Sequence, residues 1–199
     1  IVETRPYMRA LSGLAECLWK KGQRREALDI YWEMLRLNHN DNQGIRYQLG
    51  FRLLDEERYD EMEKLFRTYN EATCFMLYNM ALCRFCNDAG DADKVLHRAL
   101  RSNRHVPAYL LNEEKVPYRL PDYYSPASEE EAVIYAGEAG AAWRKAAGAL
   151  DWLQKNRSAY KDAEPGHAAD PNIARVLQDF LEEQAGRLGK STLGKYEFA

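Results

Sequence analysis

Long apolar runs and an excess of either charge are absent from this chain of 199 residues. A membrane helix needs about 18 apolar residues, and the longest apolar stretch, AVIYAGEAGAA over 132–142, is shorter and contains Glu138. Basic residues number 28 and acidic residues 31, which gives a net charge of -3. Because nucleic-acid-binding domains usually carry a clear basic excess, we expect this segment to bind neither membranes nor nucleic acid.

Cysteine is scarce as well. The four cysteines, Cys17, Cys74, Cys83 and Cys86, do not make a disulfide framework in a chain of this size. Each lies in an apolar helical pattern, where a thiol behaves as a small apolar side chain, and this usage indicates a reducing, cytoplasmic compartment. CRFC over 83–86 has the C-x-x-C spacing of redox and zinc sites. No second pair completes a metal set, so we expect these cysteines in the core or lining a groove.

Groupings that would support catalysis are missing. The four histidines are scattered, without a cysteine or carboxylate partner at useful spacing. LGKST over 188–192 lacks the first glycine of a phosphate-binding loop and follows a helical pattern rather than a strand. We therefore predict a protein that is not an enzyme, with no cofactor, no metal and no catalytic residue. The histidines are His39, His97, His105 and His167.

What the chain does contain is a series of amphipathic helical patterns. Apolar residues recur at helical spacing over 8–37, and the intervening KKGQ places Gly22 where a helix would end. Similar patterns follow over 43–69 and 73–103. We predict three helix hairpins, at about 5–38, 43–69 and 73–103.

Small residues recur at matching places in these hairpins, namely Ala27, Gly50, Ala92 and Ala99. With a repeat of about 34 residues, this pattern resembles the tetratricopeptide repeat (TPR). The resemblance implies an all-α, TPR-like α-solenoid of antiparallel helix hairpins, in which the small residues let helices pack closely. An irregular helical bundle with coincidental spacing is the alternative.

A strip over 104–127 interrupts the helices. Residues 104–126 hold four of the seven prolines and four of the thirteen tyrosines. We expect an extended segment that lies across a surface, because proline lacks the N–H donor that a helix interior needs. Ser128 followed by Glu131 forms a capping box, which predicts closing helices over 128–157, with a break near 146–148.

The same region carries a second resemblance. The pattern N-x-HVP-x-YLL, then SEEEAVIYA, a tryptophan and GALDWL, resembles the suppression-of-tumorigenicity 7 family and related bacterial TPR proteins. This resemblance covers about residues 5–153 and implies TPR-like helices and no enzymatic activity. The residues that carry it are Asn103, His105, Val106, Pro107, Tyr109, Leu110, Leu111, Glu131, Ala132, Tyr135, Ala136, Trp143, Gly148, Ala149 and Leu150.

The TPR resemblance also implies a concave groove lined by the first helix of each hairpin. Aromatic residues with interspersed polar groups suit a peptide groove, so we predict a scaffold that binds an extended protein or peptide, or its own segment 104–126. Phe51 and Phe85 could equally be core. Ser12, Glu16 and Gln48 replace the basic clamp of chaperone-binding TPRs, which disfavours an acidic chaperone terminus. The predicted partner-binding residues are Arg9, Glu16, Trp19, Lys20, Tyr47, Gln48, Phe51, Tyr78, Asn79 and Phe85.

The C-terminal part differs in composition. Residues 158–172 are polar and read as a linker, and 173–199 as a helical extension that we expect to be truncated within a longer protein. This extension resembles the first helices of the core-binding domain of tyrosine recombinases, through Thr192 and Tyr196. The alternative function is therefore a regulatory or targeting segment of a larger nucleic-acid-processing protein.

Overall fold

A computed structural model describes residues 5–163 of the chain, and the expected C-terminal extension lies outside this range. The described part is all-helical: it contains helices and no strand. Its helices are α1 (Arg5–Lys20), α2 (Arg24–Leu37), α3 (Ile45–Asp55), α4 (Tyr59–Tyr69), α5 (Cys74–Cys86), α6 (Ala92–Ser102), α7 (Val106–Leu110), α8 (Glu129–Lys145) and α9 (Ala149–Ala163). The chain divides into two units, 1–159 and 160–199, and the first is described below.

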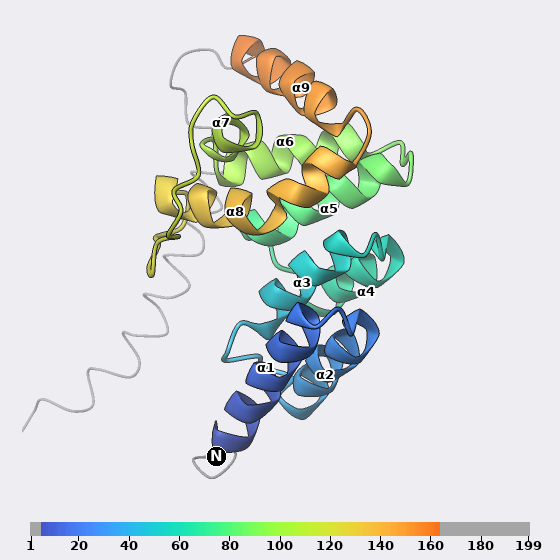
Figure 1. Cartoon of the computed structure of the whole chain (residues 1–199). Coiled ribbons are helices and arrows are strands. Elements are labelled where there is room, and N and C mark those ends of the chain that lie inside the picture. The colour runs from blue at the N-terminus through green and yellow to red at the C-terminus, as the bar shows by residue number, and fades with distance from the viewer. Residues whose placement is uncertain (1–4, 164–199) are drawn as a thin grey trace, which may run out of the picture. The chain divides into compact units, whose positions relative to one another are not determined.

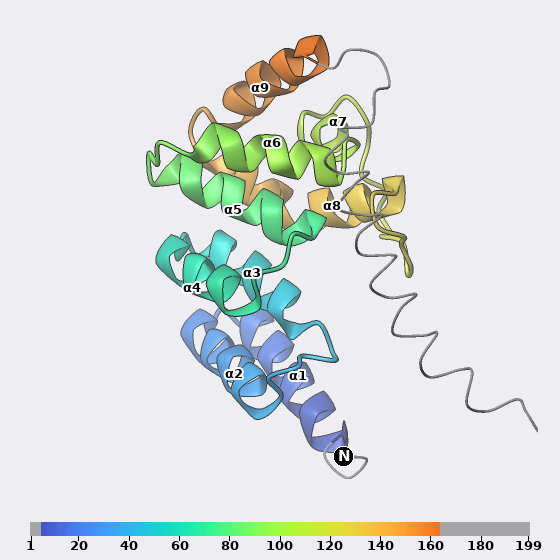
Figure 2. The ribbon, with the colours of Figure 1, turned by 180° about the vertical axis from the view of Figure 1, so that it is seen from behind.

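The first six helices form three hairpins with the predicted bounds, to within a few residues. Helix α1 packs on α2, α3 on α4, and α5 on α6, while α2 contacts α3 and α4 contacts α5 (Figures 1 and 2). Each hairpin therefore packs on the next one along the chain. The turn that closes α1 contains Gly22 with φ of 79°, as the sequence predicts, because a side chain rarely adopts this left-handed conformation.

The hairpins approach each other closely at Gly50 of α3. A Cβ atom added there would lie 2.9 Å from Nδ2 of Asn79 in α5 and 3.4 Å from Sδ of Met62 in α4. Both neighbours are buried, so neither can move aside into solvent. The small residue predicted at this position thus lets α3 pack against two helices at once.

We expect Gly50→Val to lower the free energy of unfolding by about 1–3 kcal/mol, because the added methyl groups overpack this contact. Gly13→Val is the matched control. Gly13 also lies within a helix, but an added Cβ meets no atom within 4 Å, so this variant should be neutral or stabilising. Urea unfolding followed by circular dichroism measures both variants. Equal effects at the two positions would contradict the close packing at Gly50.

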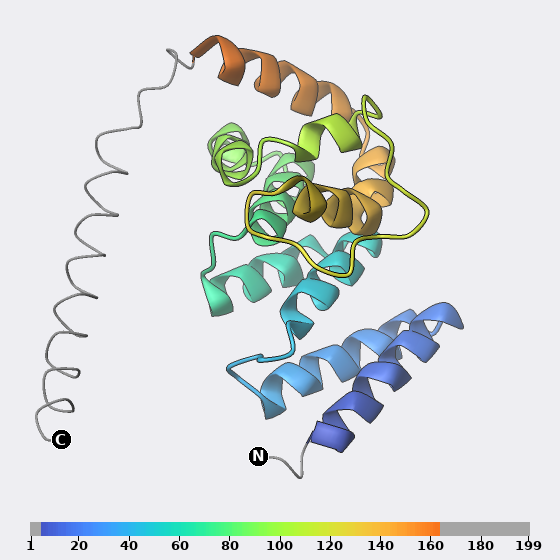
Figure 3. The ribbon, with the colours of Figure 1, turned by 90° about the vertical axis from the view of Figure 1, so that its left-hand side faces the viewer.

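The strip is extended only in part. Residues Val106–Leu110 form helix α7, whereas an extended chain was expected there. The physical reason is that Pro107 lies in the first turn of this helix, where its missing N–H needs no partner and its fixed φ is already helical. Helix α7 packs on α8, and the rest of the strip runs around α8 (Figure 3).

Half of the predicted capping box is present at the start of α8, where Ser128 accepts a hydrogen bond from the backbone N–H of Glu131. The Glu131 carboxylate accepts from the N–H of Ala127 instead of that of Ser128, which donates to the carbonyl of Ser125. The predicted break falls at Gly148, with φ of 77°, between α8 and α9. Helix α9 then continues to Ala163, so the first part of the segment expected to be a linker is helical.

Two residues of α1 differ from expectation. Leu14 is exposed over 48% of its surface, and Cys17 is also exposed, although the helical pattern placed both with the apolar residues. Helix α1 is packed mainly on α2, and its other side has no neighbouring hairpin among the described residues. None of the described helices is long and apolar enough to cross a membrane.

Candidate functional site

Helix α8 supplies the centre of an aromatic cluster. Tyr135 lies 6.0 Å from Phe51 of α3 and 5.3 Å from Tyr78 of α5, measured between ring centroids. Trp143 follows eight residues after Tyr135 on the same helix. Its ring centroid lies 6.4 Å from that of Tyr78, and its indole N–H donates to the Tyr135 hydroxyl at 2.9 Å. Burial raises the pKa of Tyr135 well above its usual value. The chain's own helix thus covers the aromatic side chains of α3 and α5.

Three of the predicted partner-binding residues are buried. Tyr78, under α8, and Asn79, beside Gly50 of α3, are 0% exposed, and Phe51 is 1% exposed, so a partner can reach at most the edge of Phe51. The periodicity of α3 and α5 alone could not show the cover by α8, because α8 comes from a segment more than forty residues away in the chain. Binding by Tyr78 would require α8 to move.

Hydrogen bonds to Asn103 and Glu131 hold the start of α8 in place. Asn103 donates from Nδ2 to Oε2 of Glu131 at 3.0 Å and to the carbonyl of Ser128 at 2.8 Å. Its own carbonyl accepts the hydroxyl hydrogen of Tyr78 at 2.7 Å. Oε2 of Glu131 also accepts from the backbone N–H of Ala127 at 2.8 Å. These bonds join the ends of α6 and the strip to the start of α8.

A second contact between strip and helix involves Tyr109 of α7. Its hydroxyl donates to Oε1 of Glu129 at 2.5 Å. The hydrogen bond to this carboxylate raises the pKa of Tyr109 to about 12. Leu120, later in the strip, lies over Gly137 of α8, where an added Cβ would approach it to 2.7 Å. These two contacts hold the strip against α8.

An open cleft of about 500 Å³ remains beside this covered region. Its aromatic part consists of Tyr47 and Phe51 of α3, Phe75 of α5 and Tyr124 of the strip, with the Phe75 and Tyr124 rings 5.4 Å apart. Its polar part comes from the start of α3, the loop before it, and α8. The remaining lining residues are Asp41, Asn42, Gln43, Gly44, Arg46, Gln48, Ile134 and Glu138.

One wall of the cleft is fixed by ion pairs. Arg46 donates to Oδ2 of Asp41 and to Oε1 of Glu71, each at 2.8 Å. Tyr47 donates its hydroxyl hydrogen to Oε2 of Glu71 at 2.9 Å. Burial and this carboxylate raise the pKa of Tyr47, so the phenol stays protonated near neutral pH. The wall is rigid because each charge in it is paired.

The other predicted partner-binding residues are distributed over separate surfaces. Tyr47 and Gln48 line the cleft, together with the edge of Phe51. Arg9 lines a neighbouring cavity of about 580 Å³ that shares Asn42 and Gln43 with the cleft. Glu16 and Lys20 are exposed on α1, and Phe85 lines a third cavity.

Trp19 is largely covered by other side chains of the protein. Its ring lies between two guanidinium groups, with Arg24 at 4.0 Å and Arg52 at 5.0 Å from the ring centroid. Only 9% of Trp19 is exposed. Arg52 in turn lies 3.7 Å from Glu138 of α8, so this residue connects the first hairpin to the wall of the cleft.

Sequence reasoning identified only Tyr47, Gln48 and Phe51 among the cleft residues, and it missed those contributed by the loop before α3, by α8 and by the strip. Ile134 and Glu138 belong to α8, and Tyr124 belongs to the strip. For Tyr124 a signal existed, because the strip's tyrosines were expected against a groove. Of these, Tyr118 and Tyr123 point into solvent instead, with Tyr123 exposed over 89% of its surface. The sequence pattern does not distinguish Tyr123 from Tyr124, so it could not predict which of the two reaches the cleft.

No group of three or more metal-ligating side chains occurs within residues 5–163. No protein-family model, curated protein or solved structure matches this chain. What the fold defines directly is an all-helical protein with an open cleft between α3, α8 and the strip.

Proposed function

We propose that this chain is a non-catalytic interaction module, built as a TPR-like solenoid, that binds an extended segment of a protein partner in the cleft between α3 and α8. The observation that carries the proposal is the composition of this cleft, which combines the accessible rings of Tyr47 and Tyr124, and the edges of the buried Phe51 and Phe75, with the amides of Asn42, Gln43 and Gln48. The ordered packing of each hairpin on the next supports the solenoid.

The chemistry of an extended peptide suits this lining. A peptide without secondary structure presents unpaired backbone N–H and C=O groups, and side-chain amides can both donate to and accept from them. Aromatic rings supply large contact area at a low cost in side-chain entropy. The paired wall around Arg46 holds its geometry before binding, which reduces the entropy lost on association.

The cleft continues toward α1, which sets the length of the segment that could bind. The cavity lined by Arg9 shares Asn42 and Gln43 with the cleft. The cleft has a volume of about 500 Å³, and this cavity has one of about 580 Å³. Arg5 and Arg9 line the α1 end. A partner segment with aromatic or aliphatic side chains at one end and an acidic residue at the other would complement both parts.

A random library of extended peptides displayed on phage tests the proposal. Peptides selected on the wild-type chain should bind Gln48→Ala and Tyr124→Ala at least tenfold more weakly, since each change removes contacts in the cleft and a loss of about 1.4 kcal/mol is tenfold in Kd. Fluorescence anisotropy of the synthesised peptides measures this. Tyr123→Ala is the matched control, because Tyr123 is the adjacent tyrosine and lies outside the cleft lining.

Two results would overturn this function. One is a selection that yields no peptide. The other is a set of peptides that bind Gln48→Ala, Tyr124→Ala and Tyr123→Ala equally well. Tyr78→Ala is unsuitable as a test of binding, because this fully buried side chain belongs to the aromatic core.

A further inference from the structure

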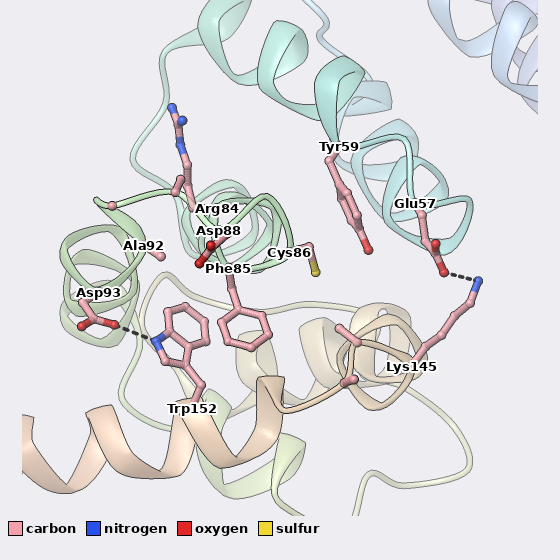
Figure 4. Close-up of a pocket in the computed structure, with 14 residues that line it drawn as sticks. Glu57, Tyr59, Arg84, Phe85, Cys86, Asp88, Ala92, Asp93, Lys145 and Trp152 are labelled. Carbon is pink, nitrogen blue, oxygen red and sulfur yellow. Dashed lines mark hydrogen bonds and ion pairs between the residues drawn. The ribbon is translucent and has the colours of Figure 1, made fainter.

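A cavity of about 750 Å³ lies where three helix–helix turns meet (Figure 4). The turn between α3 and α4 contributes Glu57 and Tyr59. The turn between α5 and α6 and the helix ends beside it contribute Arg84, Phe85, Cys86, Asp88, Ala89, Gly90, Ala92 and Asp93. Lys145 and the turn between α8 and α9 close it on the remaining side. This cavity shares no lining residue with the peptide cleft, so whatever binds there is independent of the proposed function.

The floor of this turn cavity is aromatic. The rings of Phe85 and Trp152 stack with centroids 4.7 Å apart and an interplanar angle of 24°. Trp152 also stacks on Trp143 of the buried cluster, at 6.3 Å and 14°. Gly148, with φ of 77°, makes the turn that brings α9 and its tryptophan back over Phe85. Tyr59 adds a third ring in the wall (Figure 4).

The basic groups of the cavity already have partners. Nζ of Lys145 lies 2.7 Å from Oε1 of Glu57. Arg84 pairs with Glu63 at 3.3 Å and with Asp91 at 3.6 Å, and its guanidinium points away from the aromatic floor (Figure 4). Neither cation is therefore available to neutralise the remaining acids of the lining.

Two aspartates remain without a cation. Asp88 makes no ion pair with any residue of the described range, and its φ of 51° is held by the turn. Asp93 accepts hydrogen bonds only at Oδ1, from the Trp152 indole at 2.6 Å and from Asn156 at 3.2 Å, which leaves Oδ2 for a ligand. The cavity thus combines stacked rings with two carboxylates that lack counter-ions.

We propose that the turn cavity binds a guanidinium group, the head of an arginine side chain or of a small arginine-like molecule. A planar guanidinium stacks on aromatic rings and donates to carboxylates in the same geometry, which an ammonium does less well. Asp88 and Asp93 disfavour an anion, and the polar rim disfavours a purely apolar ligand. The volume accommodates a whole arginine side chain with adjoining backbone.

Titration with N-acetyl-arginine amide tests the site, with N-acetyl-citrulline amide as the neutral probe of the same shape. The readout is the indole N–H resonance of Trp152 in the intact chain, assigned with Trp152→Phe. We expect the arginine probe to shift this resonance with Kd of about 1 mM, and the citrulline probe to leave it unchanged. Equal shifts by the two probes, or no shift by either, would overturn the proposal.

Charge-removing variants locate the ligand. Asp88→Asn and Asp93→Asn should each weaken the arginine probe at least threefold, since asparagine tolerates the left-handed φ at 88 and retains the Oδ1 acceptor at 93. Asp151→Asn is the matched control, because it loses the same charge next to Trp152 at an exposed position outside the cavity lining. Thermal melts verify that all three fold. A loss with Asp151→Asn as large as that with the other two would contradict the assignment.

The origin of the guanidinium is distinguished by two further probes, agmatine and acetyl-Gly-Arg-Gly-amide. Tighter binding of the peptide assigns the site to an arginine carried by a partner chain. Tighter binding of agmatine assigns it to a small free molecule. Failure of these titrations leaves the phage selection at the cleft unaffected, because the two sites share no residue.

Discussion

Trp143→Ala is expected to lower the free energy of unfolding by about 3–5 kcal/mol, the cost of removing a large buried aromatic side chain. Trp143 is completely buried, stacks against Trp152 and lies against Tyr78. The variant also deprives the buried Tyr135 hydroxyl of its donor. Urea unfolding of the intact chain, followed by circular dichroism, gives the measurement.

Two further variants separate the contributions. Trp143→Phe keeps most of the ring but not the indole N–H, so we expect a smaller loss, about 1–2 kcal/mol. Trp32→Ala is the control, since Trp32 is only half-buried and donates to Glu61 at 3.0 Å on the other side of the hairpins. If Trp143→Ala costs no more than Trp32→Ala, α8 does not cover α3 and α5 as described.

Trp143→Ala should also change the accessibility of the residues beneath α8. Phe51 and Tyr78 are covered by this helix, and loosening it would expose their rings. Binding of an apolar fluorescent dye should then increase at denaturant concentrations below the unfolding transition. The control variant should show no such increase.

The second large effect is expected at Glu131, where alanine should cost about 3 kcal/mol. Oε2 of this buried carboxylate accepts from Asn103 at 3.0 Å and from the backbone N–H of Ala127 at 2.8 Å. Its removal leaves one amide hydrogen of the buried Asn103 unsatisfied and takes the acceptor from the N–H of the exposed Ala127, and hydrogen bonds to a charged acceptor are worth about 1.5–3 kcal/mol each. Unfolding in urea measures the loss.

Replacing Glu131 with glutamine should lower the free energy of unfolding much less than replacing it with alanine. Glu131→Gln retains one oxygen that can accept both bonds, so we expect a loss of about 1 kcal/mol. Glu130→Ala is the control, because it removes an acid from the same helical turn at an exposed position and should change stability little. A loss for Glu131→Ala no greater than for Glu130→Ala would show that the hydrogen bonds to Asn103 and Ala127 do not hold the strip to α8.

Local signals predicted the helices well because they act within a few residues. Gly22 ends α1, Ser128 and Glu131 begin α8, and the apolar spacing gives three hairpins near their true bounds. Pro107 is the instructive failure. Proline was taken as a sign of extended chain, yet in the first turn of α7 it favours a helix, and position within the element decides between the two.

The partner-binding residues were harder to predict, because a side chain on the groove face of a helix is available only if nothing else covers it. Tyr47 and Gln48 line an open cleft, while Tyr78, from the equivalent helix of the next hairpin, is buried under α8. The spacing of apolar residues in α5 would be the same whether or not α8 covered this helix. Burial there depends on a contact between segments distant in the chain.

By itself, the sequence determined an all-helical chain, the three hairpins, the close contact at Gly50 and the cap of α8, since each depends on spacing, residue size or backbone conformation close by. Only the tertiary structure decided that α8 covers α3 and α5, that Tyr124 and not Tyr123 reaches the cleft, and that Asp88 and Asp93 line one cavity with Trp152. These are relations between residues far apart in the chain, and their energies depend on packing in three dimensions, which no local pattern records.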